Sequence, residues 1–525
     1  MTAYDAVVVG AGHNGLVCAA SLARAGRRVL VVERADRVGG VAATVELTAG
    51  YRAPAVLADV GRLRRSVVRD LGLERHGLRL LTPKVAAFAP DPDGGGVALH
   101  ADPERTAEEL KARSPQDAEA YPGFDRRVRS IASFLAHVAA ATPPDLDRPS
   151  MADALLGLRL GRAFRRLGDR AGRETLRVLP MPVADLVGDV FETDPLRALL
   201  SARGVALTAM GPWTPGSAGV FMTDAVAGGG AAGAPRYAEG GPGAVADALE
   251  RAARAAGAEV RSGAEVVAVT SRDGRATGVA LASGEEIAGR AVVSAADPKR
   301  TLSWVDPVVA GPTLLWRGRH IRSPGSVGKV NLALSGLPAF RDVADPAVLT
   351  GRIVVGSSID HLERAADDRK YGRVSEAPWL EMAIPSLTDP TLAPEGGHVA
   401  SILVHHAPYR LRRGGWDGPA RDRLGDVALE TLEAYAPGVS GLVEARQVLA
   451  PPDLEHEYGL TEGCILHAEP GLDQFFAWRP LLGHARYRFG IPGLYLAGSG
   501  AHPGGGITGA PGANAAREIL FDLRH

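Results

Sequence analysis

The beginning of the chain predicts a strand–helix–strand unit, and this pattern constrains the fold more than any other feature. Residues 6–9 form an apolar run typical of a strand buried on both faces, and the glycine-rich turn Gly10–Gly15 follows at once. Residues 16–25 are rich in Ala and Leu and predict a helix. The apolar residues 28–32 then predict a second strand, which ends at Glu33. Parallel strands joined by a helix favour a doubly wound α/β domain.

The glycine spacing in this turn is that of a dinucleotide-binding corner. Gly10 permits the tight turn, Gly12 lets the backbone approach a pyrophosphate, and Gly15 lets the helix pack closely on the strands. The free N–H groups and the dipole at the helix N-terminus attract the anion. Glu33 can accept hydrogen bonds from ribose hydroxyls and would repel a 2′-phosphate, which disfavours NADP. Further cofactor contacts are expected from His13, Asn14, Arg34, Gly39 and Gly40.

A second glycine-rich corner lies near the other end of the chain. Residues 493–498 predict an apolar strand, residues 499–512 a glycine-rich turn, and a helix is expected from Asn514. So many glycines would let a flat ring lie against the backbone, and the helix N-terminus would stabilise negative charge on a reduced flavin. The flavin half of an FAD cofactor is therefore expected at Gly498, Ser499, Gly505, Gly506, Ile507 and Thr508.

Length and composition narrow the class of protein. A chain of 525 residues suits two or more domains, and its formal net charge of -1 does not suggest a nucleic-acid binder. The 2 cysteines, Cys18 and Cys464, cannot form a C-x-x-C redox pair or a cysteine zinc site. No secretory signal and no apolar run of membrane-spanning length is visible in the sequence, so a cytoplasmic protein is expected.

The middle of the chain predicts two insertions into the dinucleotide domain. Residues 102–207 are helical in pattern, a strand meander with a hairpin turn at Asp273-Gly274 follows, and residues 291–294 predict another buried strand. Strands and helices alternate beyond it, and a sheet that roofs the flavin is expected there. The prediction is a discontinuous Rossmann-type FAD-binding domain of segments 1–85, 236–300 and 481–525, with an α+β substrate domain of segments 86–235 and 301–480.

Histidines supply candidate acid–base groups, and each has a simpler interpretation as well. His467 either points into a cavity as an acid or base or is a satisfied core histidine, and His502 follows the flavin turn with the same two alternatives. The run Glu455-His456-Glu457 is interpreted as part of a strand, where consecutive side chains point to opposite faces. Shared metal ligation is therefore not expected.

These motifs together resemble the phytoene desaturase-like branch of FAD-dependent oxidoreductases. The resemblance rests on Gly10–Gly15, Glu33, Gly39-Gly40, the 291–297 strand and above all residues 493–514, and it extends over nearly the whole chain. Within this branch the sequence is similar to the subgroup that includes pyridine nucleotide-disulfide oxidoreductase domain-containing protein 2. The resemblance implies an amine oxidase/phytoene desaturase-like two-domain flavoprotein with non-covalently bound FAD.

The resemblance also assigns two further residues. Val266 matches the residue whose backbone meets adenine. Lys329, in the segment Gly325–Val330, is similar in position to the lysine near flavin N5 in amine oxidases, where a drier pocket lowers its pKa. The alternative is a strand lysine whose ammonium group lies in solvent. His502-Pro503-Gly504 stands where amine oxidases place aromatic residues, which puts an aromatic cage for amines in doubt.

Three functions are compatible with these motifs and with the family resemblance. The leading hypothesis is a dehydrogenase or desaturase that removes hydride from an apolar or amphipathic small molecule, with oxygen, a quinone or another carrier as electron acceptor. The second is a flavin-dependent amine or alcohol oxidase, and the third is a non-catalytic FAD-binding scaffold or regulator. The basic stretch 159–177 is interpreted either as a solvated helix face or as a peripheral contact with anionic lipid.

Overall fold

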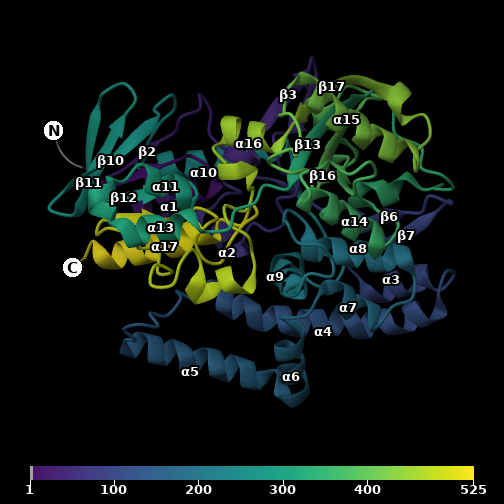
Figure 1. The fold of residues 1–525 in the computed structure, drawn as a ribbon, viewed down its shortest axis with the longest axis horizontal. Coiled ribbons are helices and arrows are strands. Elements are labelled where there is room, and N and C mark those ends of the chain that lie inside the picture. The colour runs from purple at the N-terminus through teal and green to yellow at the C-terminus, as the bar shows by residue number, and fades with distance from the viewer. Residues whose placement is uncertain (1–3, 525) are drawn as a thin grey trace.

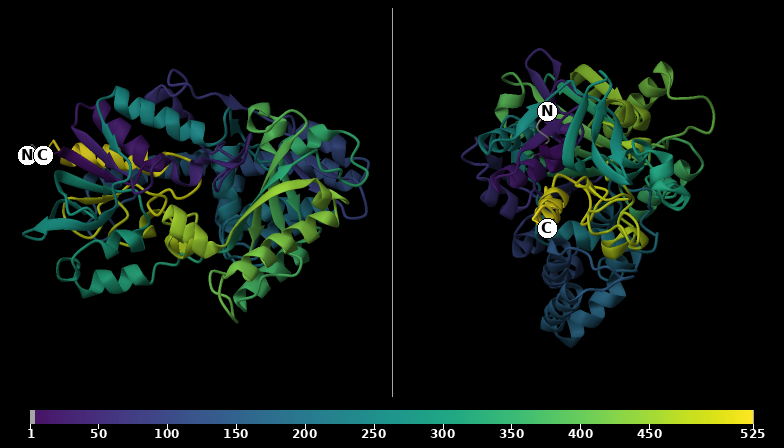
Figure 2. Two further views of the ribbon diagram at one scale, coloured as in Figure 1. Left: turned by 90° about the horizontal axis from the view of Figure 1, so that it is seen from above. Right: turned by 90° about the vertical axis from the view of Figure 1, so that its left-hand side faces the viewer.

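A computed structural model describes residues 4–524 as two sheets of 7 strands each, with helices and two small two-stranded sheets (Figure 1). The first sheet lies at the end of the molecule where both chain termini meet, and the second sheet lies at the opposite end (Figure 2). Both the first and the last strand–helix corner belong to the first sheet. Residues at opposite ends of the sequence are thereby brought together.

The first sheet is built around parallel, fully buried strands. β1 pairs in parallel with β2 and with the end of β12, and β12 pairs in parallel with β18. The sheet consists of β1 (Tyr4–Val9), β2 (Val29–Val32), β9 (Glu259–Arg261), β10 (Val266–Arg272), β11 (Arg275–Leu281), β12 (Glu286–Ser294) and β18 (Leu494–Leu496). Asp273 and Gly274 both have positive φ, 52° and 72°, and make the two-residue turn between β10 and β11 that the sequence predicted.

Alternating residues of β1 face two different cores. Ala6 and Val8 pack against helices α1 (His13–Arg24) and α10 (Gly243–Ala255), whereas Val7 and Val9 pack with residues of the β10–β11 hairpin. A strand segment covered on both faces has no polar side, which explains why residues 6–9 are all apolar.

The second sheet is mostly antiparallel and has one face in a core and one face on a cavity. Its order is β17-β13-β16-β15-β14-β6-β7, and only β14 and β6 run parallel. Val330 and Leu332 of β13 pack in the core with α15 (Gly418–Glu433), and the residues between them point the other way. The strands are β6 (Ala87–Pro90), β7 (Gly96–Leu99), β13 (Val327–Leu334), β14 (Arg352–Val355), β15 (Leu380–Ala383), β16 (His398–His405) and β17 (Val443–Leu449).

A layer of helices lies beside the second sheet and is the helical stretch that the sequence predicted (Figure 1). The chain in this region forms α3 (Pro103–Leu110), α4 (Pro115–Ala140), α5 (Met151–Arg166), α6 (Gly168–Val178), α7 (Val183–Gly188), α8 (Asp194–Val205) and α9 (Ser217–Gly228). α5 and α6 stand apart from both sheets, and α5 has no buried residue. This pair is the most exposed helical part of the molecule.

The remaining elements are two small two-stranded sheets and further helices. The small sheets are the hairpin of β3 (Thr44–Thr48) with β4 (Tyr51–Pro54), and the pairing of β5 (Leu80–Leu81) with β8 (Tyr237–Ala238), which lie far apart in the sequence. The other helices are α2 (Arg65–Leu71), α11 (Pro298–Ser303), α12 (Pro307–Ala310), α13 (Pro312–Arg319), α14 (Ile359–Lys370), α16 (Pro451–Tyr458) and α17 (Ala510–Asp522).

Two local predictions are wrong. Glu455, His456 and Glu457 lie on helix α16, not on a strand, because Pro451 starts a helix there and the left-handed Gly459 ends it. The last helix begins at Ala510, four residues before the predicted start, because Pro511 occupies its first turn after a left-handed glycine.

Candidate active site

The glycines of the first corner either contact another segment of the backbone or border an open cavity. A Cβ on Gly15 would lie 2.1 Å from the carbonyl oxygen of Gly10, so only glycine fits there. A Cβ on Gly12 would meet nothing within 4 Å, because this residue borders an open cavity. Gly10 has a φ of 100°, a conformation that favours glycine. The predicted functions of the three glycines agree with this geometry.

The two glycine corners are in direct contact. His13 Nε2 lies 3.1 Å from the carbonyl oxygen of Gly506, and Asn14 Nδ2 donates to Ser499 Oγ at 3.1 Å. A Cβ on Gly512 would lie 2.1 Å from the Asn14 carbonyl oxygen, so the helices α1 and α17 approach each other backbone to backbone. Two helix N-termini therefore converge on one place, which suits a ligand with negative charge.

A cavity of about 290 Å³ runs from this corner along the end of β2. Glu33 lies on its wall and accepts hydrogen bonds from the backbone N–H groups of Ala11 (2.7 Å) and Ala35 (2.9 Å). Val266 closes the far end, where the resemblance places adenine. Arg34 also lines the cavity and donates to the carbonyl oxygens of residues 456 and 457, which fixes α16 at its rim.

The remaining predicted cofactor contacts divide between the cavity walls and their support. Gly40 lines the cavity, and Gly39 supports it by donating its N–H to the Ala11 carbonyl oxygen at 3.0 Å. Gly498 lies behind the wall, where a Cβ would come within 2.5 Å of the Ala295 carbonyl oxygen. Ser499 lines this first cavity. The turn Gly505–Thr508 continues into a second, larger cavity.

The larger cavity has a volume of about 610 Å³ and adjoins the first at Leu57 and Gly506, which line both. One wall is the turn of residues 504–508, and another is the open face of the second sheet. Lys329, Leu403 and Glu381 are cross-strand neighbours on β13, β16 and β15, and all three line this wall. A ligand could thus lie between the glycine turn and the sheet.

Lys329 is buried on this wall, with 1% of the residue exposed, and donates a hydrogen bond to Ser401 Oγ. Burial lowers the pKa of its ammonium group to about 7, against a smaller opposing effect of the Glu381 carboxylate. The alternative of a lysine with its ammonium group in solvent is therefore wrong. The structure places the amine on the wall of the larger cavity.

The histidine candidates lie in different surroundings. His467 lines the smaller cavity, and burial lowers its pKa. Burial also lowers the pKa of His13 to about 4, and the nearby His467 adds to this shift. His502 lines neither cavity: its Nε2 lies 3.0 Å from the Val138 carbonyl oxygen, and burial lowers its pKa to about 3. The structure therefore keeps His467 beside the dinucleotide cavity and gives His502 a position in the core.

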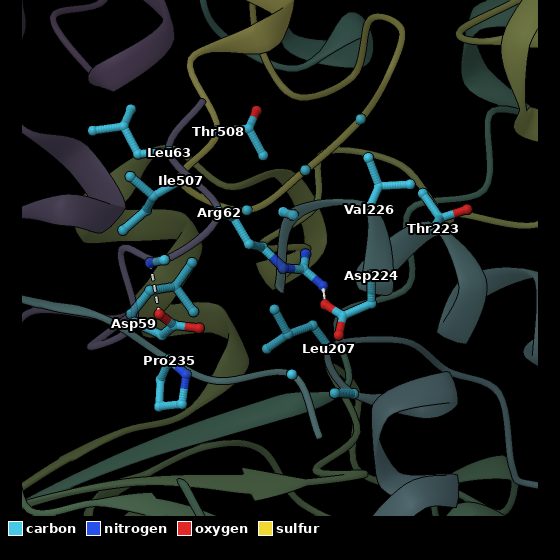
Figure 3. Close-up of a pocket in the computed structure, with 18 of the residues that line it drawn as sticks. Asp59, Arg62, Leu63, Leu207, Thr223, Asp224, Val226, Pro235, Ile507 and Thr508 are labelled. Carbon is cyan, nitrogen blue, oxygen red and sulfur yellow. Dashed lines mark hydrogen bonds and ion pairs between the residues drawn. The ribbon is translucent and has the colours of Figure 1, made fainter. Parts of the chain in front are cut away.

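A buried cluster of charges in the larger cavity was not predicted from the sequence (Figure 3). Arg62 extends from beside Ile507 and Thr508 across the cavity and pairs with Asp224 of α9. Arg203 of α8, with 3% of its side chain exposed, also pairs with Asp224, its Nε donating at 2.8 Å. Asp59 Oδ1 accepts the backbone N–H groups of Gly61 and Arg236.

The strands carried a signal for part of this cluster. Lys329 and Glu381 stand within mostly apolar strands and Arg352 begins a third, and a charge in a buried strand needs a specific partner or a cavity. Asp224 likewise interrupts the apolar helix α9. Arg62 offers no such signal, because the segment around it is rich in arginine.

The described residues contain neither a metal-binding cluster nor a membrane-spanning helix. From residue 4 to 524, no group of His, Cys, Asp and Glu side chains is arranged to hold a metal ion. In the same range, no helix has both the length and the apolar composition needed to cross a bilayer.

The residues fit FAD. The smaller cavity has a glycine-lined approach, two converging helix N-termini and an acidic residue at the expected ribose position. It leads directly to the glycine turn that lies under the second sheet. This fold and site define an FAD-binding two-domain flavoprotein, with a Rossmann-type domain beside a mixed second domain. The chain belongs to the flavin-containing amine oxidoreductase family, whose model matches residues 15–520.

Relatives across the whole chain agree with this assignment. The chain is 35% identical over 547 residues to pyridine nucleotide-disulfide oxidoreductase domain-containing protein 2 of Rattus norvegicus, with 99% of this chain and 94% of that protein covered. It is 27% identical over 532 residues to phytoene desaturase (neurosporene-forming) of Rhodobacter capsulatus, with 97% and 92% covered. The predicted family, its phytoene desaturase-like branch and the similarity to the first of these proteins are confirmed.

The fold is shared with solved structures of low sequence identity. Cyclohexylamine oxidase from Brevibacterium oxydans IH-35A aligns over 100% of both chains with a TM-score of 0.61 and 15% identity. This confirms the predicted fold class, and the family match together with the phytoene desaturase relative confirms an FAD-dependent oxidoreductase.

Proposed function

We propose that the protein is a dehydrogenase or desaturase that removes hydride from an apolar or amphipathic small molecule in the larger cavity. The observation that carries the proposal is the junction at Gly506, where the dinucleotide cavity opens under the face of the second sheet. FAD bound there supplies the hydride acceptor, while the protein supplies binding and orientation. The phytoene desaturase relative acts, by its name, on an apolar hydrocarbon, which supports this substrate class.

The chain's own residues would perform three tasks in this reaction. Gly12, Asn14 and Glu33 would hold the dinucleotide, and the turn 504–508 would support the ring. The apolar residues of α4 and α9 would exclude water from the larger cavity and hold an apolar substrate. Lys329, whose pKa burial lowers to about 7, would take up or release a proton at its Nζ near neutral pH.

An amine or alcohol oxidase is the second candidate, and Lys329 favours it. A buried lysine on the cavity wall, bonded to Ser401, is suited to positioning a water molecule beside the reacting centre. The two candidates differ in their electron acceptor, because an oxidase passes electrons to oxygen and releases peroxide.

Substrate reduction of the FAD-loaded protein under anaerobic conditions tests the proposal. Isoprenoid and acyl compounds with saturated bonds should bleach the flavin absorbance at about 450 nm, and primary amines should not. Peroxide release with amines in air would favour the oxidase instead. Bleaching by dithionite but by none of the organic substrates would contradict both candidates.

We also propose that α5 and α6 contact an anionic membrane surface from which an amphipathic substrate is taken up. Met151, Leu155 and Leu158 of α5 are 80%, 53% and 51% exposed, and the arginines of this helix, from Arg159 on, follow them in the sequence. Exposed apolar side chains among arginines match the interface of a bilayer with acidic headgroups. Figure 2 shows this helix pair projecting from the rest of the molecule.

Vesicle co-sedimentation tests the membrane contact. The protein should sediment with phosphatidylglycerol-containing vesicles at low salt, bind less at high salt, and bind little to phosphatidylcholine vesicles. Leu155→Glu with Leu158→Glu should abolish sedimentation without altering flavin absorbance. Equal binding to both vesicle types, or to neither, would contradict the contact.

A further inference from the structure

The lining of the larger cavity has an excess of basic side chains. Its three acidic residues are Asp59, Asp224 and Glu381, and basic residues outnumber them, since arginines enter the cavity from several separate segments. A cavity with this imbalance and apolar walls has a positive potential, which attracts an anionic ligand. The excess therefore points to a ligand with negative charge.

The acidic residues are already engaged or poorly able to compensate the arginines. Asp224 is shared between Arg62 and Arg203. Asp59 accepts two backbone N–H groups through one oxygen. Burial raises the pKa of Glu381 and so favours its neutral form, although the nearby Arg352 opposes this shift. The positive charge of the arginines in the cavity therefore exceeds the negative charge that the acidic residues of the cavity supply.

Arg352 lines the cavity and lacks an ion pair among the described residues. Its Nη2 donates to the Gly233 carbonyl oxygen at 2.6 Å, and within residues 4–524 no carboxylate forms an ion pair with it. Arg62 and Arg352 are close enough to repel each other, and this repulsion adds to burial in lowering the pKa of Arg62, against the opposing effects of the Asp59 and Glu381 carboxylates. Two guanidinium groups that repel each other in a cavity are stabilised by an anion placed between them.

The opposite walls of the cavity are apolar. Leu135 and Ala139 of α4 and Val220 and Val226 of α9 line the cavity on the side of these helices. An apolar chain fits this side, and a charged group does not. Together, the charged and apolar parts describe a receptor for an amphipathic molecule.

We propose that the larger cavity binds an amphipathic substrate whose anionic group, a carboxylate or a phosphate, docks between Arg62 and Arg352. The planar guanidinium groups match the oxygens of either anion in pairs. The apolar chain lies against α4 and α9 and passes the turn 504–508. This inference rests on the proposed function, because it names the class of molecule that would be oxidised in that cavity.

Four probes of one chain length test the inference on the FAD-loaded protein. Octanoate, octyl phosphate, 1-octanol and octylammonium are titrated, and binding is followed by the change in flavin absorbance and by calorimetry. At least one of the two anions should bind about tenfold or more tightly than the alcohol, and the ammonium should bind least. The better of the two anions identifies the headgroup. An alcohol or ammonium that binds as tightly as both anions overturns the inference.

Substitutions at one arginine locate the anion. Arg352→Met should reduce anion affinity to that of 1-octanol, and Arg352→Lys should retain part of it. The matched control is Arg319→Met on the exposed surface of α13, which should change nothing. Unchanged anion affinity in Arg352→Met overturns the inference. If that variant does not fold, the comparison of the four probes on the unaltered protein still decides.

A second measurement separates substrate docking from an effect on the flavin alone. Arginines near a flavin also stabilise its negatively charged reduced form. If Arg352 served only that purpose, Arg352→Met would lower the reduction potential of the bound flavin and leave probe affinity unchanged, which overturns the inference. Failure of the protein to bind FAD at all would contradict the proposed function itself, whereas bleaching by a neutral substrate alone would contradict only the anion site.

Discussion

The two cavities of the active site are built in different ways. The smaller cavity is shaped by backbone, with glycines whose missing side chains allow helices and strands to approach within contact distance. The larger cavity is shaped by side chains that come from α4, α8, α9, four strands of the second sheet and the segment around Arg62. The first arrangement depends on a short local spacing, and the second on the packing of distant segments. This difference explains why one cavity is recognisable as a motif and the other is not.

The largest expected effect is the loss of bound flavin when a side chain is added at the glycine corner of the smaller, backbone-shaped cavity. Gly15→Val should eliminate bound flavin, because even a Cβ would lie 2.1 Å from the Gly10 carbonyl oxygen and the corner would have to open. The ratio of absorbance at about 450 nm to protein measures this loss. Gly157→Ala on α5 is the control, since a Cβ there meets nothing within 4 Å. Full flavin content in Gly15→Val would show that the corner is not the dinucleotide site.

The next effect tests the side-chain-built cavity. Asp224→Asn leaves the buried Arg203 and its neighbour Arg62 without their shared carboxylate, so the free energy of unfolding should fall by about 3–5 kcal/mol. Chemical denaturation followed by fluorescence measures it. Asp194→Asn, which removes an exposed partner of Arg197, should stay within about 1 kcal/mol. Equal losses in both variants would mean that the buried cluster adds nothing beyond a surface ion pair.

Lys329 should make stability depend on pH. Its pKa is about 7 in the folded protein and 10.5 in the unfolded chain, so between these values the unfolded state binds more protons. Stability contributed by this group is therefore lowest below pH 7 and rises with pH towards 10.5. From about pH 6 to about pH 8.5 the protein should gain about 2 kcal/mol relative to Lys329→Met. Denaturation curves at both pH values measure the gain, and the exposed Lys84→Met should show none.

The smallest effect concerns the ribose end of the backbone-built cavity. Glu33→Gln keeps the shape of the side chain but removes a charged acceptor, so FAD should bind about tenfold more weakly, which corresponds to about 1.4 kcal/mol. Titration of the cofactor-free protein with FAD gives the dissociation constant. An unchanged constant would mean that Glu33 acts only through its hydrogen bonds to Ala11 and Ala35.

The sequence predicted the strands near the cofactor well and the charged cavity hardly at all. The strand at residues 6–9 and the turn at Asp273-Gly274 depend on local pattern, and both were predicted correctly. The helix start at Ala510 was missed because a proline in a glycine-rich turn also fits a loop. The domain boundaries stay a prediction. So do the roles of Lys329 and His467, since placement in a cavity does not establish chemistry.

The amino-acid sequence by itself determined the parallel strands, the two glycine corners and hence the FAD site, because glycine spacing and apolar runs act over a few residues and need no distant partner. Only the tertiary structure decided that Arg62, Arg352 and Glu381 share one cavity and that His502 lies outside both. Contacts between such distant residues depend on how the sheets and helices pack. The residue types alone do not predict them, because each of these types also occurs on solvated surfaces.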